Sequence, residues 1–126
     1  MTERGIPSDG VQPADGSGLS MWNTTTAEAT VALLKAMSET KAFRDALPVG
    51  GIDGTLKARF PAPEHRGKVI AITGTLSVAS CLSGYVLTTK GETIIFSILM
   101  NHFDRKAGSA AARRAQDDIV RTLLSL

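Results

Sequence analysis

The chain has 126 residues, of which 43% are hydrophobic and 21% charged, and its formal net charge is +2. This length fits one small domain and not two, and the composition is ordinary for a globular protein. The small, scattered positive charge argues against a nucleic-acid partner and against a membrane partner. No apolar run approaches the ~18 residues of a membrane-spanning helix. The N-terminus lacks the apolar segment of a signal peptide, so the chain as written is expected to stay in the cytoplasm.

The cysteine content excludes two kinds of site. Cys81 is the single cysteine, so neither an internal disulfide nor a cluster of thiolate metal ligands can form within the chain. Cys81 lies in an apolar run, and free cysteine is among the most buried residue types, so we expect a buried side chain rather than a nucleophile. No other metal-ligand spacing and no phosphate-binding glycine loop occurs. We therefore predict no metal and no cofactor.

The N-terminal third is predicted to be a leader followed by a helix. Residues 1–14 are rich in Gly, Pro, Ser and Asp and are expected to form a flexible leader, with the folded part at 15–126. Trp22 is expected to anchor the leader onto the domain. Thr25 and Glu28 have the spacing of a capping box at a helix start. The apolar residues of that helix recur near every 3.6 positions and predict one buried face: Ala27, Val31, Leu34 and Met37.

A β-rich region follows the first helices. Pro48 ends a short helical piece, and glycine-rich turns lead into strands predicted at 68–76, 81–89 and 93–100. Lys90-Gly91 lies at the centre of a hairpin turn between the last two strands. The third strand is a nearly continuous apolar run, which is typical of a strand buried on both faces.

The tail at 105–126 predicts an amphipathic helix that covers one face of the sheet. Asp117 and Asp118 are placed on its solvated face. Its apolar positions are Ala112, Ala115, Ile119, Val120, Leu123 and Leu124. The fold class is therefore α+β, with a three-stranded antiparallel meander between N-terminal helices and a C-terminal covering helix.

The chain contains five short sequence blocks whose order and spacing, taken together, are specific enough to identify relatives. They are Asp-Gly-Ser-Gly-Leu-Ser at 15–20, Leu-Pro-Val-Gly-Gly-Ile-Asp-Gly-Thr-Leu at 47–56, Thr-Gly-Thr-Leu-Ser at 73–77, Leu-Ser-Gly-Tyr-Val at 82–86 and Phe-Ser-Ile-Leu-Met-Asn-His at 96–102. Together they resemble the C-terminal part of the D-alanyl-D-alanine carboxypeptidase/endopeptidases, the low-molecular-mass class C penicillin-binding proteins. The resemblance implies part of a transpeptidase/β-lactamase-like domain.

The resemblance also implies a substrate-binding strand. In the family this strand carries Lys-Thr-Gly followed by Thr, and its threonine hydroxyls hold the terminal carboxylate of the substrate. Its glycine lets the substrate backbone lie against the strand, and the N–H of Thr75 matches the second oxyanion donor. The implied substrate-binding residues are Thr73, Gly74, Thr75, Leu76 and Ser77. The implied ligands are a peptidoglycan stem peptide or a β-lactam.

The chain departs from the family at the catalytic residues. Ile72 stands where the family has the lysine of Lys-Thr-Gly, and we expect it to favour strand structure and burial. The one Ser-x-x-Lys, Ser38 to Lys41, lies at a helix end and on the wrong side of the 15–20 loop, and Ser-x-Asn does not occur. We therefore assign no catalytic residue.

Four other polar residues are expected to be structural. His65 is expected to be exposed, and His102 to make a structural hydrogen bond beside Asn101. Asp15 and Ser17 are expected to shape a tight loop, as Asp and Ser commonly do.

Three functions remain open at this point. The first is a truncated D-Ala-D-Ala carboxypeptidase that is inactive alone. The second is a fragment that assembles with a separate chain carrying the nucleophile, and the third is a non-enzymatic peptide-binding module. The unpaired sheet edge would also favour a dimer or aggregation. The family is exported, which places it in the periplasm or outside the cell, so localisation stays undecided.

Overall fold

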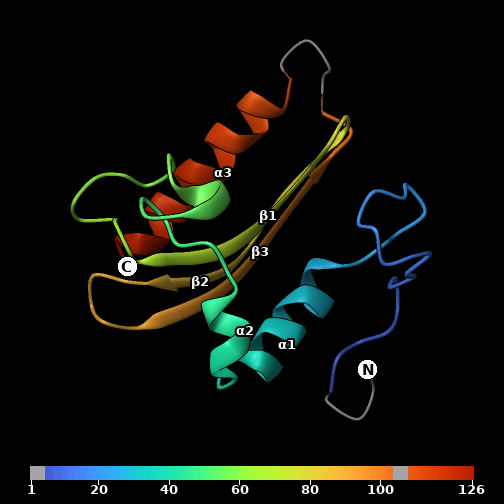
Figure 1. The fold of residues 1–126 in the computed structure, drawn as a ribbon, viewed down its shortest axis with the longest axis horizontal. Coiled ribbons are helices and arrows are strands. Elements are labelled where there is room, and N and C mark those ends of the chain that lie inside the picture. Colours follow the sequence, from blue (N-terminus) through green and yellow to red (C-terminus); the bar gives the residue numbers. More distant parts are fainter. Residues whose placement is uncertain (1–4, 104–107) are drawn as a thin grey trace.

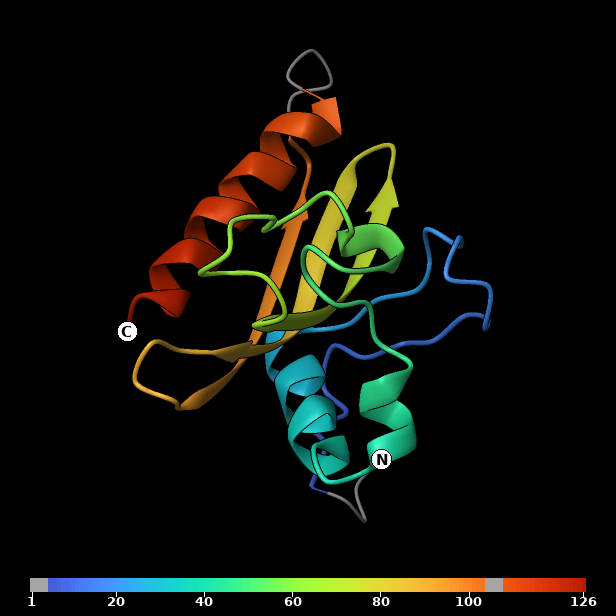
Figure 2. The same ribbon diagram turned by 60° about the vertical axis from the view of Figure 1, so that its left-hand side comes forward.

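The computed structural model describes residues 5–103 and 108–126, and it has a three-stranded sheet between helices (Figures 1 and 2). The strands are antiparallel and lie in the order β1-β2-β3. This confirms the predicted α+β meander. The elements are α1 (Ala27–Met37), α2 (Lys41–Asp45), the 3-10 turn η2 (Gly54–Leu56), β1 (Val69–Leu76), β2 (Ala79–Leu87), β3 (Thr93–Asn101) and α3 (Gly108–Leu124).

The segment before α1 makes contacts of its own. Ile6 is buried, and Gln12 pairs with Thr24 as an isolated antiparallel bridge, so packing begins before residue 15. The domain boundary at 14/15 stays a prediction. Trp22 is 79% exposed, so the prediction that it anchors the leader is wrong.

Helix α1 begins one residue later than the sequence predicted. The hydroxyl of Thr26, and not of Thr25, accepts the backbone N–H of Ala29 at 3.0 Å. Thr26 has alanine three residues on, so the glutamate of a capping box is missing. The buried residues of α1 are Ala29 and Leu34, whereas the predicted core position Ala27 is exposed.

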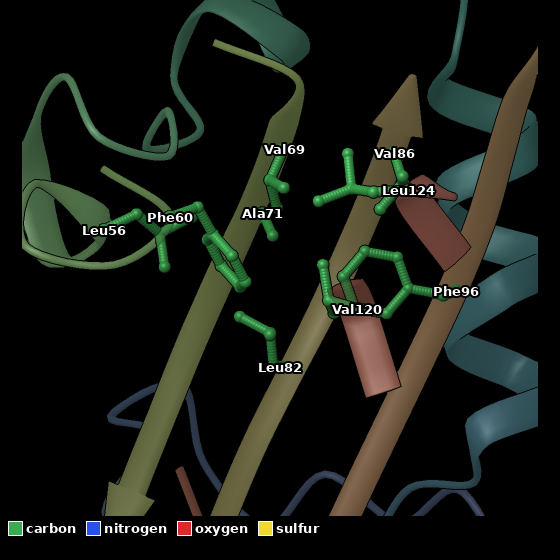
Figure 3. Close-up of a cluster of buried hydrophobic side chains, with 9 residues drawn as sticks. All are labelled: Leu56, Phe60, Val69, Ala71, Leu82, Val86, Phe96, Val120 and Leu124. Atoms are coloured by element: carbon green, nitrogen blue, oxygen red, sulfur yellow. The ribbon is translucent and has the colours of Figure 1, made fainter. Parts of the chain in front are cut away.

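The strands divide their side chains between two helical layers. Alternate residues of a strand point to opposite faces of the sheet, and on β2 the residues Leu82 and Val86 point toward α3. Figure 3 shows this core, to which the segment around η2 contributes Leu56 and Phe60. Its other members are Val69, Ala71, Phe96, Val120 and Leu124.

Tyr85 points to the opposite face of the sheet, where it bonds to α1. Its hydroxyl donates a hydrogen bond to the carbonyl of Leu34 in α1, at 2.6 Å. Burial raises the pKa of Tyr85, although the charge of Arg44 opposes this. Arg44 also lies over the ring, 5.6 Å from its centroid. α1 and α3 therefore cover opposite faces of one sheet.

Strand β3 is less buried than its sequence predicted. Its central residues are half-buried and only Phe96 is buried, so the prediction of burial on both faces is wrong. The reason is position, because β3 is an edge strand of this sheet. The register pairs even-numbered residues of β3 with β2, so the backbone groups of Ile95, Ser97 and Leu99 point outward. They have no backbone partner among the described residues.

Helix α3 buries part of the predicted apolar set, at every fourth position, and one polar residue as well. Ala112, Gln116, Val120 and Leu124 are buried, while the predicted core residues Ala115 and Ile119 are exposed. Residues 105–107 of the predicted helix lie outside the described residues. Among the described residues, no helix is long and apolar enough to cross a membrane.

Candidate functional site

Strand β1 has one edge paired with β2 and one edge facing outward. Along an antiparallel strand, residues alternate between bonding to the partner and pointing away from it. Leu87 donates to the carbonyl of Lys68 at 2.8 Å, so the even-numbered residues bond to β2. The odd-numbered ones point outward, as the bonds of the 48–50 segment show. Gly50 donates to Val69 at 2.8 Å, and Ala71 donates to Pro48 at 3.0 Å.

Beyond Ala71 this outer edge is open. The backbone N–H and C=O groups of Thr73 and Thr75 point outward and have no backbone partner among residues 5–103 and 108–126. Such a row of free donors and acceptors is a template for one more strand. The open edge is therefore suited to pair with an extended peptide.

The side chains of β1 alternate between the two faces at this point. Thr73 and Thr75 face α3, and the Thr73 hydroxyl donates to the hydroxyl of Thr55 at 2.9 Å. Ile72 lies on the opposite face and is 49% exposed, so the expected burial of this residue is wrong. Gly74 shares that opposite face, and a Cβ placed on it would meet only the Cβ of Cys81, at an ordinary 3.8 Å.

The structure thus brings together only part of the predicted binding strand. Thr73 and Thr75 share the open edge and the α3 face. Leu76 is half-buried on the other face, and Ser77 lies exposed in the two-residue turn between Leu76 and Ala79. The roles of all five residues in substrate binding stay predictions.

A cavity of about 450 Å³ lies between the open edge and α3. Its lining includes Thr55, Thr73 and Thr75, together with Arg113 and Arg114 of α3. This volume is in the range of small-molecule sites.

A buried polar network forms the floor of this cavity. Arg59 donates from Nε to Asp117 at 2.8 Å, and its terminal nitrogen forms an ion pair with the same carboxylate at 2.6 Å. Arg59 also donates to the side chain of Gln116 at 3.3 Å, and Gln116 donates to Ser80 at 3.1 Å. Ser80 is the cross-strand neighbour of Thr75. The network therefore joins the η2 segment, α3 and the strand next to the open edge.

This network was not predicted from the sequence, and the position of Asp117 differs from its prediction. Asp117 was predicted on a solvated face, but its side chain is only 17% exposed and is paired with Arg59, which is 11% exposed. Asp118 does lie at the surface, paired with Arg121. The four-residue spacing of Gln116 with Ala112 and Val120 is the signal that could have placed Gln116 in the core.

The one Ser-x-x-Lys of the chain does not form a nucleophile and base. Ser38 donates from its hydroxyl to the carbonyl of Lys35 at 2.8 Å, as a residue at a helix end does. Lys41 forms an ion pair with Asp45 instead of reaching Ser38. A serine nucleophile needs a base within hydrogen-bond distance, and the assignment of no catalytic residue stays a prediction.

The loop and histidine predictions are mostly confirmed. Asp15 accepts the backbone N–H of Ser17 at 3.0 Å and its hydroxyl at 2.8 Å. Hydrogen bonds from Ser17, which have the larger effect, and from Asn23 lower the pKa of the Asp15 carboxyl. His102 lies 3.2 Å from the side-chain oxygen of Asn101. His65, expected to be exposed, is half-buried.

Cys81 is half-buried rather than buried. Burial raises the pKa of its thiol, against a smaller opposing hydrogen bond to the backbone of Met100, so the thiol stays protonated at neutral pH. Within the described ranges, no group of three His, Cys, Asp or Glu side chains is placed to hold a metal ion.

Comparison with known proteins gives consistent matches. The model of the D-Ala-D-Ala carboxypeptidase 3 (S13) family matches residues 1–124. The D-alanyl-D-alanine carboxypeptidase of Actinomadura sp. (strain R39) is 39% identical over 105 residues, covering 77% of this chain and 19% of the relative. D-alanyl-D-alanine carboxypeptidase DacB of Haemophilus influenzae is 31% identical over 107 residues. The match covers 81% of this chain and 22% of DacB. The chain thus spans about a fifth of the length of these curated relatives.

Solved structures have the same fold. Penicillin-binding protein 4 from Haemophilus influenzae aligns over 99% of this chain and 30% of its own, with a TM-score of 0.86 and 24% identity. The structure of its complex with a β-lactam aligns over 82% of this chain and 25% of its own, with a TM-score of 0.75 and 28% identity. A third structure is a penicillin G-acylated endopeptidase from Bdellovibrio bacteriovorus in complex with an immunity protein. It aligns over 98% of this chain and 36% of its own, with a TM-score of 0.78 and 22% identity. With the match of the family model, these findings show that the chain belongs to the D-Ala-D-Ala carboxypeptidase 3 (S13) family, as a counterpart of its C-terminal part.

Proposed function

We propose that this chain supplies the substrate-holding strand of a D-alanyl-D-alanine carboxypeptidase and does not itself form an acyl-enzyme. The observation that carries the proposal is the open edge of β1 at Thr73 and Thr75, beside an apolar Ile72. The names of the curated relatives indicate the ligand class, a peptide that ends in D-Ala-D-Ala. Thr73, Gly74, Thr75, Leu76 and Ser77 are the proposed binding segment.

The lack of acylation follows from charge and geometry. Acyl transfer to serine needs a group that removes the hydroxyl proton and positive charge that favours this step. Ile72 provides no charge, and the Ser38 hydroxyl is bonded to a helix carbonyl. The 126 residues are therefore proposed to be part of a carboxypeptidase that is inactive alone.

Labelling with penicillin tests the absence of acylation. We expect no covalent adduct when the 126-residue chain is incubated with a fluorescent penicillin and analysed by intact-mass spectrometry. A penicillin-reactive D-alanyl-D-alanine carboxypeptidase, labelled in parallel, shows that the reagent is active. A penicilloyl adduct on Ser38 or on any other serine would contradict the proposal.

Peptide titration tests binding at the β1 edge. We expect N-acetyl-D-Ala-D-Ala to shift the backbone amide signals of residues 73–77 in heteronuclear NMR spectra. Thr75→Pro should abolish the shifts, because proline removes the outward N–H without removing a bond to β2. Thr75→Val keeps the N–H and removes only the hydroxyl, so it should weaken the shifts without abolishing them. Unchanged spectra of the native chain, or full binding by Thr75→Pro, would refute an edge-binding role.

Two alternatives keep the same strand but differ in the partner. A non-enzymatic peptide-binding module would bind the peptide and need no other chain. A complementing fragment would join a chain that carries Ser-x-x-Lys, which the exposed Leu19, Met21 and Trp22 favour, at 72%, 79% and 79% exposure. Co-purification with such a chain, together with penicillin labelling of the complex, would support the second alternative over the first.

A further inference from the structure

Strand β3 has an outer edge that lacks the features with which proteins protect sheet edges. Charged side chains, prolines, bulges or a very short strand usually keep an exposed edge from pairing. β3 is 9 residues long, has no charged residue and no proline, and pairs with β2 without a bulge. The outward backbone groups of Ile95, Ser97 and Leu99 have no backbone partner among the described residues. This edge is therefore open to a further strand.

The outer edge of β1 is shorter. The 48–50 segment bonds to Val69 and Ala71, which leaves only Thr73 and Thr75 open. No such segment bonds to the backbone of the β3 edge in the part of the chain that the structure describes. The β3 edge thus has the longer run of free backbone donors and acceptors.

The β3 edge is self-complementary about its middle residue, Ser97. An antiparallel second copy, related by a two-fold axis through Ser97, would pair all 9 residues of the strand. Ile95 would then lie opposite Leu99 of the second copy, and Ser97 opposite its own counterpart. Because the backbone groups of these residues point outward, each such pair would exchange two backbone hydrogen bonds.

The side chains of β3 also fit this register. Even-numbered residues of β3 face α3, as the position of Phe96 in the core shows. Phe96 would lie opposite Ile98 of the second copy, and Ile94 opposite Met100, so both pairs on this face are apolar. Ile94, Ile98 and Met100 are half-buried in a single copy. Pairing would remove more of their apolar surface from water and would place no like charges opposite each other.

We propose that two copies of this chain pair through their β3 edges and form an isologous dimer. The dimer has one continuous sheet, with three strands from each copy. Both copies use the same surface, so the contact closes at two subunits. The inference is independent of the proposed function, because the β1 edge of each copy stays free to bind a peptide.

Light scattering after size-exclusion chromatography tests the dimer. With a reducing agent present, so that Cys81 does not cross-link copies, we expect the 126-residue chain to have twice its monomer mass of 13.3 kDa. Ser97→Pro should raise the dissociation constant of the dimer at least about tenfold, because it removes an outward N–H from each copy and no bond to β2.

Ser97→Ala is the matched control for the proline variant. Both substitutions lose the hydroxyl bond between Ser97 and Ser83, but alanine keeps the outward N–H, so this variant should remain dimeric. Circular dichroism confirms that each variant is folded. A monomeric native chain, species larger than a dimer, or a folded Ser97→Pro that dimerises as strongly as the native chain would overturn the inference.

Hydrogen exchange of the native chain locates the contact without a substitution. We expect the amide protons of Ile95, Ser97 and Leu99 to exchange more slowly in the dimer than after dilution to the monomer. Those of Thr73 and Thr75 should exchange equally fast in both states. Slower exchange at Thr73 and Thr75, or no change at the three β3 residues, would show that the copies meet through another surface and would overturn the inference.

Discussion

Replacing Gly84 with alanine is expected to destabilise the fold by about 3 kcal/mol or more, the range of severe overpacking. A Cβ at this position would lie 2.6 Å from the Cα of Ala71 and still closer to the carbonyl oxygen of Ile70. Both atoms belong to the backbone of β1, which cannot move without breaking its pairing with β2. Urea unfolding followed by circular dichroism measures the free energy of unfolding.

Gly74→Ala is the matched control for Gly84→Ala. Both glycines lie in neighbouring strands of the sheet, but the nearest atom to a Cβ at Gly74 is the Cβ of Cys81 at 3.8 Å. We expect the control to change the free energy of unfolding by less than about 1 kcal/mol. Equal stability of the two variants would contradict the close approach of β2 to β1. Reduced peptide binding by folded Gly74→Ala would instead indicate that the ligand lies against this glycine.

Asp117→Asn is expected to lower the free energy of unfolding by about 2 kcal/mol. The change leaves the Arg59 guanidinium, with a side chain only 11% exposed, without the carboxylate that balances its charge. Loss of one partner from a buried ion pair costs ~3–5 kcal/mol, and partial exposure reduces this cost. Arg59 also lies over the ring of Phe60 in the core, so its displacement would disturb the floor of the cavity.

Asp118→Asn provides the control for the buried pair. Asp118 and Arg121 form an ion pair whose side chains are 73% and 47% exposed. We expect its loss to change stability by less than about 1 kcal/mol, because water screens exposed pairs. Chemical denaturation of both variants at one ionic strength gives the comparison. Similar effects of the two substitutions would show that Asp117 is not held in a buried network.

Local sequence signals predicted the elements well because they act over short distances. The Lys90-Gly91 turn and the change from helical to β periodicity at Lys68 placed the meander. Observed strand ends lie within about two residues of the predicted ones, which is the usual uncertainty of element boundaries. The N-cap moved by one residue because Thr25 and Thr26 are both able to cap a helix.

Errors arose where burial depends on residues far apart in the chain. The apolar run of β3 predicted a central strand, but the sheet order puts it at an edge. Asp117 looked like a surface charge because its partner, Arg59, is 58 positions away. The family resemblance singled out Thr73 and Thr75. The register with β2 was needed to show that their backbone groups point outward.

The sheet has two open edges that differ in character. On β1 the outward backbone groups without a partner among the described residues are those of Thr73 and Thr75. On β3 they are those of Ile95, Ser97 and Leu99. If the β3 edge of one copy paired with the β1 edge of another, the contact would be head-to-tail, and each added copy would leave one edge of each kind free. Such heterologous contacts build rings or open filaments rather than two-fold dimers. A ligand bound along β1 would therefore block the addition of further copies at that edge and limit self-association.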